Sequence, residues 1–354
     1  MLGRMSVVTD LPEHSLADAD KLRLWIEMTR IRCFEVEAIK YYQGGYMGGW
    51  LNVQIGQEPL PVVIRSVMGP LDHSISSYRC LGHALASGMS MRSCMAELFG
   101  KRDGASKGKG GQHSLHSPET RFWGGYGFVG TQTPLACGLA FGLKHRGEAG
   151  VVFGCLGDGA VNQGAFHEAL NLAALFHLPV VFIIENNRYA MGTSVARSSA
   201  MKDCLARRAE GYGMDWDTVE ANAIPEFRSK LLVAHRRARE ACRPCLLEVF
   251  TYRYEGHTIA DANKFKYRAK AEVEDKVAHH DPIQLWGQVL IDESIANADE
   301  LQYIRVRAMA EAKDASAFAR ESPYPTRESI TEDVHWEVDH QTSAGTTGRH
   351  FFND

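Results

Sequence analysis

The segment between residues 151 and 184 constrains the fold more than any other part of the sequence. Residues 151–156 (VVFGCL) form a short apolar run that predicts a buried strand, and Gly157-Asp158-Gly159 ends it. Residues 164–177 then carry apolar side chains at helical spacing, and residues 178–184 are a second run rich in β-branched residues. A strand, a turn, a helix and a second strand within about 35 residues predict the βαβ unit of a parallel sheet.

The rest of the chain extends this unit in both directions. Residues 17–42 predict a long helix, a basic helix at 226–240 leads to a strand at 245–252, and residues 296–321 predict a charged amphipathic helix. Asp281-Pro282 is typical of a helix start. We expect an α/β fold with a parallel sheet, helices on both of its faces, an N-terminal helical arm and a C-terminal helical extension. We expect one domain over residues 1–354, with a flexible tail at 339–354.

Composition excludes several classes of protein. The formal net charge of −4 argues against a dominant role on nucleic acid or on an anionic membrane. No apolar run approaches the length of a membrane helix, and the first residues lack the apolar stretch of a signal peptide. The 8 scattered cysteines do not suggest a disulfide scaffold in a chain of 354 residues. We therefore expect a cytoplasmic protein that binds neither nucleic acid nor a membrane.

Polar side chains follow both strands of the predicted βαβ unit. Asp158 lies at the carboxyl end of the first strand, and Asn186-Asn187 ends the second. In open α/β sheets ligands bind at this edge, and Mg²⁺ takes oxygen ligands that it shares with phosphates. The spacing is thus compatible with a Mg²⁺ ion that carries a diphosphate, but two unrelated turns would have the same composition.

A longer stretch of sequence makes the pattern far more specific. Residues 157–194 read GDGAVNQGAFHEALNLAALFHLPVVFIIENNRYAMGTS, and GQE at 56–58, YR at 78–79, KGKGG at 107–111 and YR at 267–268 accompany them. This sequence resembles the thiamine-diphosphate motif of the alpha subunit of the decarboxylating component of 2-oxo acid dehydrogenases, of the pyruvate or acetoin type. The resemblance covers residues 32–334 and implies the thiamine-diphosphate-binding fold.

The resemblance also assigns roles to individual residues. It makes the side chains of Asp158 and Asn187 and the backbone carbonyl of Tyr189 the Mg²⁺ ligands, and His257 the active-site histidine at the start of a mobile loop (258–268). The residues that it assigns to thiamine diphosphate are Tyr78, Arg79, Gly127, Val129, Asp158, Gly159, Ala160, Asn187, Arg253 and His257.

Half of the expected active site is missing from the chain. In the family, a separate beta subunit supplies the glutamate that activates the cofactor, and Glu58 does not align with that residue. We therefore expect an assembly of two alpha and two beta chains that decarboxylates a 2-oxo acid and passes the acyl unit to a lipoyl carrier. The alternative enzyme moves a two-carbon ketol unit to a biosynthetic carrier protein. A non-catalytic assembly subunit is disfavoured, because the chain retains the motif residues.

Other motifs favour structural interpretations. Residues 125–130 fit the dinucleotide pattern G-x-G-x-x-G, but no clear strand is predicted before them and no suitable carboxylate follows about twenty residues later. Cys242 and Cys245 lack a second metal-binding pair and are expected to pack. His279-His280 is expected at the surface, and His167 and His177 flank a helix whose apolar face is already explained.

Three departures from the family pattern concern the donor substrate. Asn52 stands where pyruvate-type relatives usually carry histidine, Leu81 replaces a second histidine, and Gln112-His113-Ser114 moves a third imidazole by one position. An amide cannot titrate, and leucine can neither titrate nor hydrogen-bond. We therefore predict that pyruvate is not the preferred donor, unless His83, His113 or His116 takes over the vacated role.

Overall fold

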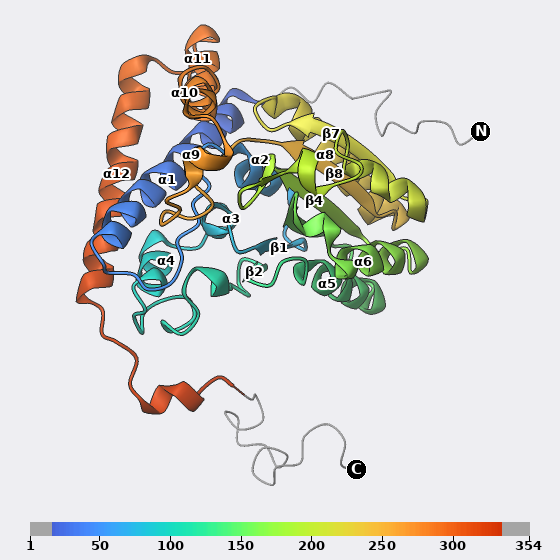
Figure 1. The fold of residues 1–354 in the computed structure, drawn as a ribbon, viewed down its shortest axis with the longest axis horizontal. Helices are drawn as coiled ribbons and strands as arrows, with labels where there is room; N and C mark the ends of the chain where they lie inside the picture. Colours follow the sequence, from blue (N-terminus) through green and yellow to red (C-terminus); the bar gives the residue numbers. More distant parts are fainter. Residues whose placement is uncertain (1–15, 335–354) are drawn as a thin grey trace.

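The structure, a computed structural model that describes residues 16–334, is built around a six-stranded parallel sheet (Figure 1). The strands follow the order β2-β1-β3-β4-β8-β7, and every neighbouring pair in the sheet runs parallel. They are β1 (His73–Ser77), β2 (Phe122–Tyr126), β3 (Val152–Gly157), β4 (Val180–Asn186), β7 (Asp215–Glu220) and β8 (Cys245–Phe250). A separate antiparallel pair consists of β5 (Tyr189–Ala190) and β6 (Thr193–Ser194).

Helices cover the sheet and extend beyond it. They are α1 (Asp18–Gln43), α2 (Pro59–Val67), α3 (Leu81–Ser87), α4 (Met91–Leu98), α5 (Gln132–Arg146), α6 (Gly164–Leu175), α7 (Val195–Ser198), α8 (Ile224–Ala241), α9 (Lys264–Tyr267), α10 (Lys270–His279), α11 (Pro282–Asp292) and α12 (Ala298–Glu321). Short 3-10 turns are η1 (Gly111–Ser114), η2 (Ala160–Asn162), η3 (Ala206–Tyr212) and η4 (Glu328–Thr331). Among these described helices, none is long and apolar enough to cross a membrane.

The predicted βαβ unit is confirmed as β3, α6 and β4. Six residues of β3 pair in parallel with β4, from Val152 opposite Val180 to Gly157 opposite Glu185. Alternate residues of β4 point to opposite faces, so Val181 packs into one apolar core while Phe182 packs into the other. Both faces of the strand are buried, which explains why its sequence is continuously apolar instead of alternating.

The two faces of the sheet have different coverings. Helices α5 and α6 contribute Ala136, Leu143, Phe166 and Leu170 to one core, and α1, α2 and α8 contribute to the other. On the second side the N-terminal arm, α1, packs against the C-terminal helix α12 (Figure 1). This arrangement confirms the predicted fold class and the N-terminal and C-terminal helical elements.

Capping side chains set the ends of the C-terminal helices. The Asp281 side chain accepts hydrogen bonds from the backbone N–H of Ile283 and Gln284, at 3.0 and 3.1 Å, as its Asp-Pro sequence predicts. Asn297 and Glu300 form a reciprocal capping box at the start of α12. The predicted helix at 296–321 therefore begins two residues later than expected.

Sequence reasoning missed three strands of the six-stranded sheet and the short β5–β6 pair, and it misjudged one motif. β2 runs directly into the glycine motif at 125–130, so the statement that no strand precedes it is wrong. β1 (HSISS) is buried but polar, and β7 (DWDTVE) is a charged edge strand, so neither has the apolar pattern that predicts a strand. The predicted tail at 339–354 and the first residues of the chain lie outside the described residues.

Candidate active site

The predicted site residues meet at the carboxyl edge of the parallel sheet. Tyr78 and Arg79 follow β1, Asp158 follows β3, Asn187 follows β4, and Arg253 lies three residues beyond β8. Because the strands are parallel and neighbouring, segments far apart in sequence converge there. They line a cavity of about 230 Å³, here called the inner pocket.

A larger cavity of about 790 Å³, the outer cavity, adjoins the inner pocket. The two share Tyr78, Val129 and Met191 as lining residues. Gly127 and His257 line the outer cavity, and the other predicted cofactor residues that line the inner pocket are Arg79, Asp158, Gly159, Ala160, Asn187 and Arg253. The structure thus brings every predicted site residue to one of these two connected spaces, with Tyr189 in the inner one.

The candidate metal ligands come from two turns. After β4, the backbone N–H of Tyr189 donates to Asn187 Oδ1 at 3.3 Å, and this local bond turns the chain. Asn187 Nδ2 donates to Gln57 Oε1 at 3.2 Å, which leaves the amide oxygen directed toward the pocket residues. Gly159 lets the turn after β3 come close, since a Cβ built there would lie 2.5 Å from the Cβ of Ala190.

The residues that carry these candidate oxygen ligands line one pocket, and two of the oxygens already bind a cationic nitrogen. Asn187 Oδ1 and the Tyr189 carbonyl both accept hydrogen bonds from Nη1 of Arg253, at 3.1 and 2.6 Å. Asp158 is 4% exposed, and its Oδ2 has no hydrogen-bond partner among the described residues. Burial raises the pKa of Asp158 to about 6, so its carboxyl is mostly ionised at neutral pH. A buried carboxylate oxygen without a partner is costly, and a cation would relieve that cost.

Two buried arginines give the site its positive charge. Arg253 is 1% exposed, and its Nε has no partner among the described residues. Arg79 is also buried, and its Nη1 and Nη2 donate to the backbone carbonyls of Val53 and His257. Guanidinium groups in this arrangement suit a diphosphate, which they can bind in bidentate fashion.

His257 is held by its backbone, and its ring is left uncommitted. Its carbonyl accepts from Asn52 Nδ2 at 2.7 Å and from Arg79, and its N–H donates to Asp261 Oδ2 at 3.0 Å. Its Nδ1 is buried without a partner among the described residues. Burial, with Arg79 and Arg253 nearby, lowers the pKa of His257 to about 4. At neutral pH the ring is therefore an uncharged hydrogen-bonding group, not the charge switch that an ordinary histidine would provide.

Several polar residues that sequence reasoning did not assign support the site. Gln112 holds the segment at Asn52, accepting its N–H at 2.8 Å, and donates to the Tyr78 carbonyl at 2.9 Å. Glu185 lines the inner pocket and bonds to His83 Nε2 at 2.6 Å. Both contacts join distant parts of the chain, so no local spacing could have revealed them.

The other motifs have structural roles. Glu58 is fully buried away from both cavities, paired with Arg32 and accepting the Gly56 N–H. Cys245 is buried at the start of β8, and Cys242 ends α8. His279 is exposed as predicted, and His167 accepts or donates a bond to the Tyr212 hydroxyl at 2.9 Å.

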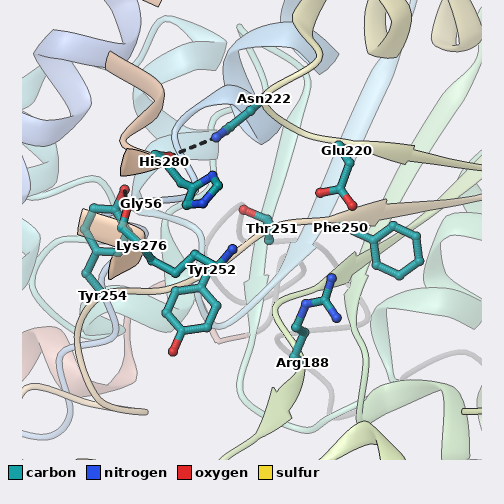
Figure 2. Close-up of a pocket in the computed structure, with 10 residues that line it drawn as sticks. All are labelled: Gly56, Arg188, Glu220, Asn222, Phe250, Thr251, Tyr252, Tyr254, Lys276 and His280. Atoms are coloured by element: carbon teal, nitrogen blue, oxygen red, sulfur yellow. Dashed lines mark hydrogen bonds between the residues drawn. The ribbon is translucent and has the colours of Figure 1, made fainter. Parts of the chain in front are cut away.

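A separate small pocket of about 80 Å³ lies near the ends of β7 and β8 (Figure 2). There Asn222 Nδ2 donates to the His280 carbonyl at 2.9 Å, and Lys276 reaches in from α10. His280 thus lines a pocket as well as lying at the surface, which its sequence position did not suggest. No residue assigned to the cofactor lines this pocket.

Known proteins resemble this chain over most of its length. The family model described as dehydrogenase E1 component matches residues 26–328. The chain is 41% identical over 315 residues to a protein of Rhizobium meliloti named pyruvate dehydrogenase E1 component subunit alpha, covering 89% of this chain and 90% of that one. It is 39% identical to the protein of that name from Rickettsia bellii, covering 86% and 92% of the two chains. The somatic, mitochondrial form from Bos taurus is 37% identical, covering 89% and 79%. The chain belongs to the dehydrogenase E1 component family.

Proposed function

We propose that this chain is the alpha subunit of a thiamine-diphosphate-dependent 2-oxo acid dehydrogenase. The observation that carries the proposal is the convergence of Asp158, Asn187, the Tyr189 carbonyl and Arg253 at the carboxyl edge of the sheet. Oxygen ligands beside buried guanidinium groups are what a Mg²⁺–diphosphate pair requires. The relatives' names support the same reading.

The donor set fits the expected cofactor. Asp158 Oδ2 is a buried oxygen without a partner among residues 16–334, and two further oxygens already bind a cationic nitrogen. In the proposal, Asp158, Asn187 and Tyr189 hold Mg²⁺, and Arg79 and Arg253 hold the diphosphate. Gly127 and Val129 would contact the aminopyrimidine ring. When bound, thiamine diphosphate supplies the electron sink that allows carbon dioxide to leave a 2-oxo acid.

The chain's own residues prepare the cavity for this chemistry. Arg79 and Asn52 fix the backbone of His257, so its uncharged ring can donate or accept a hydrogen bond at the reacting centre. Asp261 links the two ends of the loop, because its Oδ2 accepts hydrogen bonds from the His257 N–H and from the Tyr267 hydroxyl, at 3.0 and 2.7 Å. A loop anchored in this way would position the donor and exclude water from the site.

A partner subunit is needed to complete the site. Large apolar side chains around the outer cavity are exposed: Phe128 by 84%, Trp50 by 69% and Met191 by 64%. Apolar clusters of this kind mark protein interfaces. In the proposal a beta subunit covers them and supplies the activating glutamate, and two alpha and two beta chains assemble. Glu58 is unsuited to that role because it is buried in an ion pair with Arg32.

A lipoyl-bearing carrier is proposed as the acceptor of the acyl unit. The relatives named as pyruvate dehydrogenase subunits favour this acceptor over a biosynthetic carrier of ketol units. No separate feature of the two cavities favours the ketol alternative.

The test is reconstitution of the alpha subunit with a beta subunit from the same organism. Thiamine diphosphate should bind the complex only with Mg²⁺ present, and a 2-oxo acid should be decarboxylated with transfer to a lipoyl domain. Binding without Mg²⁺, or the absence of decarboxylation with every 2-oxo acid offered, would contradict the proposal. A nicotinamide cofactor should not bind.

A further inference from the structure

The outer cavity contains a second imidazole beside His257. His113 lines the cavity, and its ring meets that of Tyr78 edge to face with centroids 6.1 Å apart. Tyr78 makes a similar contact with His257, at 5.6 Å, so the tyrosine lies between the two imidazoles. Neither His113 Nε2 nor His257 Nδ1 has a hydrogen-bond partner among the described residues.

The position of His113 is built by its neighbours. Gln112, the preceding residue, is anchored to Asn52 through its amide oxygen, at 2.8 Å, and to the Tyr78 carbonyl through its amide nitrogen, at 2.9 Å. A Cβ built on Gly127 would lie 3.2 Å from His113 Nδ1, so the bare glycine backbone makes room for the ring. The imidazole is therefore held against a residue that the proposed function places beside the cofactor.

The other two candidate histidines have different positions. His83 Nε2 is bonded to Glu185 at 2.6 Å, and both side chains are buried. His116 packs against the Tyr126 ring and fills the space above Gly124. Neither residue lines the outer cavity. Of the three histidines, only His113 brings an imidazole into that space.

His113 would act as an uncharged group. Burial lowers the pKa of His113, so the ring is neutral at physiological pH. A neutral imidazole offers one N–H donor and one acceptor. It is thus suited to hydrogen-bond an oxygen atom of a bound molecule rather than to pair with a charge.

We infer that His113 contacts the donor 2-oxo acid in the outer cavity and forms a hydrogen bond to one of its oxygen atoms. The inference rests on the proposed function, because the donor enters this space only if the cofactor lies in the inner pocket. It assigns the imidazole to a position that the family resemblance does not, one residue before the histidine of the usual pattern.

The test compares His113→Ala with the matched control His116→Ala in the reconstituted alpha–beta complex. Three quantities are measured for each: kcat/KM for 2-oxo acids, the dissociation constant of thiamine diphosphate with Mg²⁺, and that of a phosphonate analogue of the donor that cannot lose carbon dioxide. The analogue constant reports donor contact independently of turnover. The His113→Asn variant, which retains hydrogen-bonding capacity, provides a second replacement if the alanine variant fails to assemble.

Loss of one donor contact should lower kcat/KM by about ten-fold and weaken analogue binding to a similar degree. Cofactor binding should stay within about two-fold of the wild-type value, and His116→Ala should change none of the three. Unchanged analogue binding by His113→Ala, or a loss that merely follows weakened cofactor binding, would overturn the inference. Failure of the proposed function is distinguishable, because the wild-type complex itself would then neither bind the cofactor nor turn over.

Discussion

Replacing Glu97 with alanine should open the glycine-rich loop that carries Gln112 and His113. Glu97 lies on α4 with no exposed surface, and its carboxylate accepts four backbone N–H groups of the loop. Oε2 accepts those of Ser106 and Gly108, at 2.7 and 2.9 Å, and Oε1 accepts those of residues 110 and 111, both at 2.9 Å. The Glu97 side chain thus fixes the backbone of the loop through four hydrogen bonds.

The free energy lost in the variant follows from the four backbone N–H groups that Glu97 accepts. A buried N–H without a partner costs about 1–3 kcal/mol, and these groups are half-buried, so water can replace part of each bond. We take about 1 kcal/mol for each donor, or about 4 kcal/mol for the loop. That corresponds to a roughly 1000-fold larger open population, because each 1.4 kcal/mol is about ten-fold. Glu97→Gln keeps one acceptor oxygen and should show roughly half the energy.

Trypsin provides the assay, because the loop contains Lys107 and Lys109. Cleavage at these lysines reports local opening, and mass spectrometry identifies the sites. The matched control is Asp72→Ala. Asp72 is buried and accepts the N–H of Gly69 and Val151, at 2.6 and 2.8 Å, before the amino end of β1 and far from the cavities. The control should lose stability without faster loop cleavage. If Glu97→Ala is cleaved at the wild-type rate, the loop does not depend on this carboxylate.

Four further predictions concern pH, catalysis, donor and assembly. Burial raises the pKa of Glu35 from 4.5 to about 8, so its stabilising contribution is full at low pH and is lost as pH rises toward 8. In thermal melts between pH 5 and 8, Glu35→Gln should remove up to about 1.4 kcal/mol per pH unit from this dependence of stability on pH. Parallel curves of stability against pH for the wild type and the variant would contradict the prediction. His257→Ala should lower kcat about 100-fold, equally at pH 6 and pH 8 because the ring is neutral at both, with cofactor affinity unchanged; a loss confined to one pH would refute the neutral assignment. In a panel of donor substrates, pyruvate should give a lower kcat/KM than at least one of the branched 2-oxo acids, hydroxypyruvate or a ketose phosphate. The reason is that the Asn52 amide is hydrogen-bonded to the His257 carbonyl and Leu81 is buried. A clear preference for pyruvate would contradict this prediction. The purified alpha chain without a beta subunit should not decarboxylate any donor, and measurable turnover would show that the site is complete in one chain.

The parts of the fold that sequence predicted best are those whose residues face an apolar core on both sides. The runs that became β3 and β4 could be recognised because nearly every residue is apolar. β1 could not, because its serines are buried by neighbouring strands, which only the sheet order supplies. The pairing of β1 with its neighbours in the folded sheet, and not its local sequence pattern, therefore determines that this polar segment is a strand.

The candidate site divides in the same way. The convergence of Asp158 and Asn187 at one edge of the sheet could be predicted because each directly follows a strand of one βαβ unit. Glu97 could not, since a glutamate on an amphipathic helix ordinarily faces water, and only the folded loop reveals its four donors. The contact of Arg253 with Asn187 joins positions 66 residues apart and depends on β4 lying beside β8.

The proposed metal site is tested most directly by calorimetric titration of thiamine diphosphate into the alpha–beta complex, with and without Mg²⁺. The wild-type complex should bind only with Mg²⁺, and Asp158→Ala should weaken binding by on the order of 100-fold or more, because a direct ligand matters at least as much as its supporting residues. The variant's melting temperature without ligand should not fall, since the substitution removes a buried carboxylate whose Oδ2 has no hydrogen-bond partner among the described residues. Asp203→Ala, an exposed carboxylate, is the control. Cofactor binding by Asp158→Ala with unchanged affinity and unchanged Mg²⁺ dependence would contradict the assignment of this site.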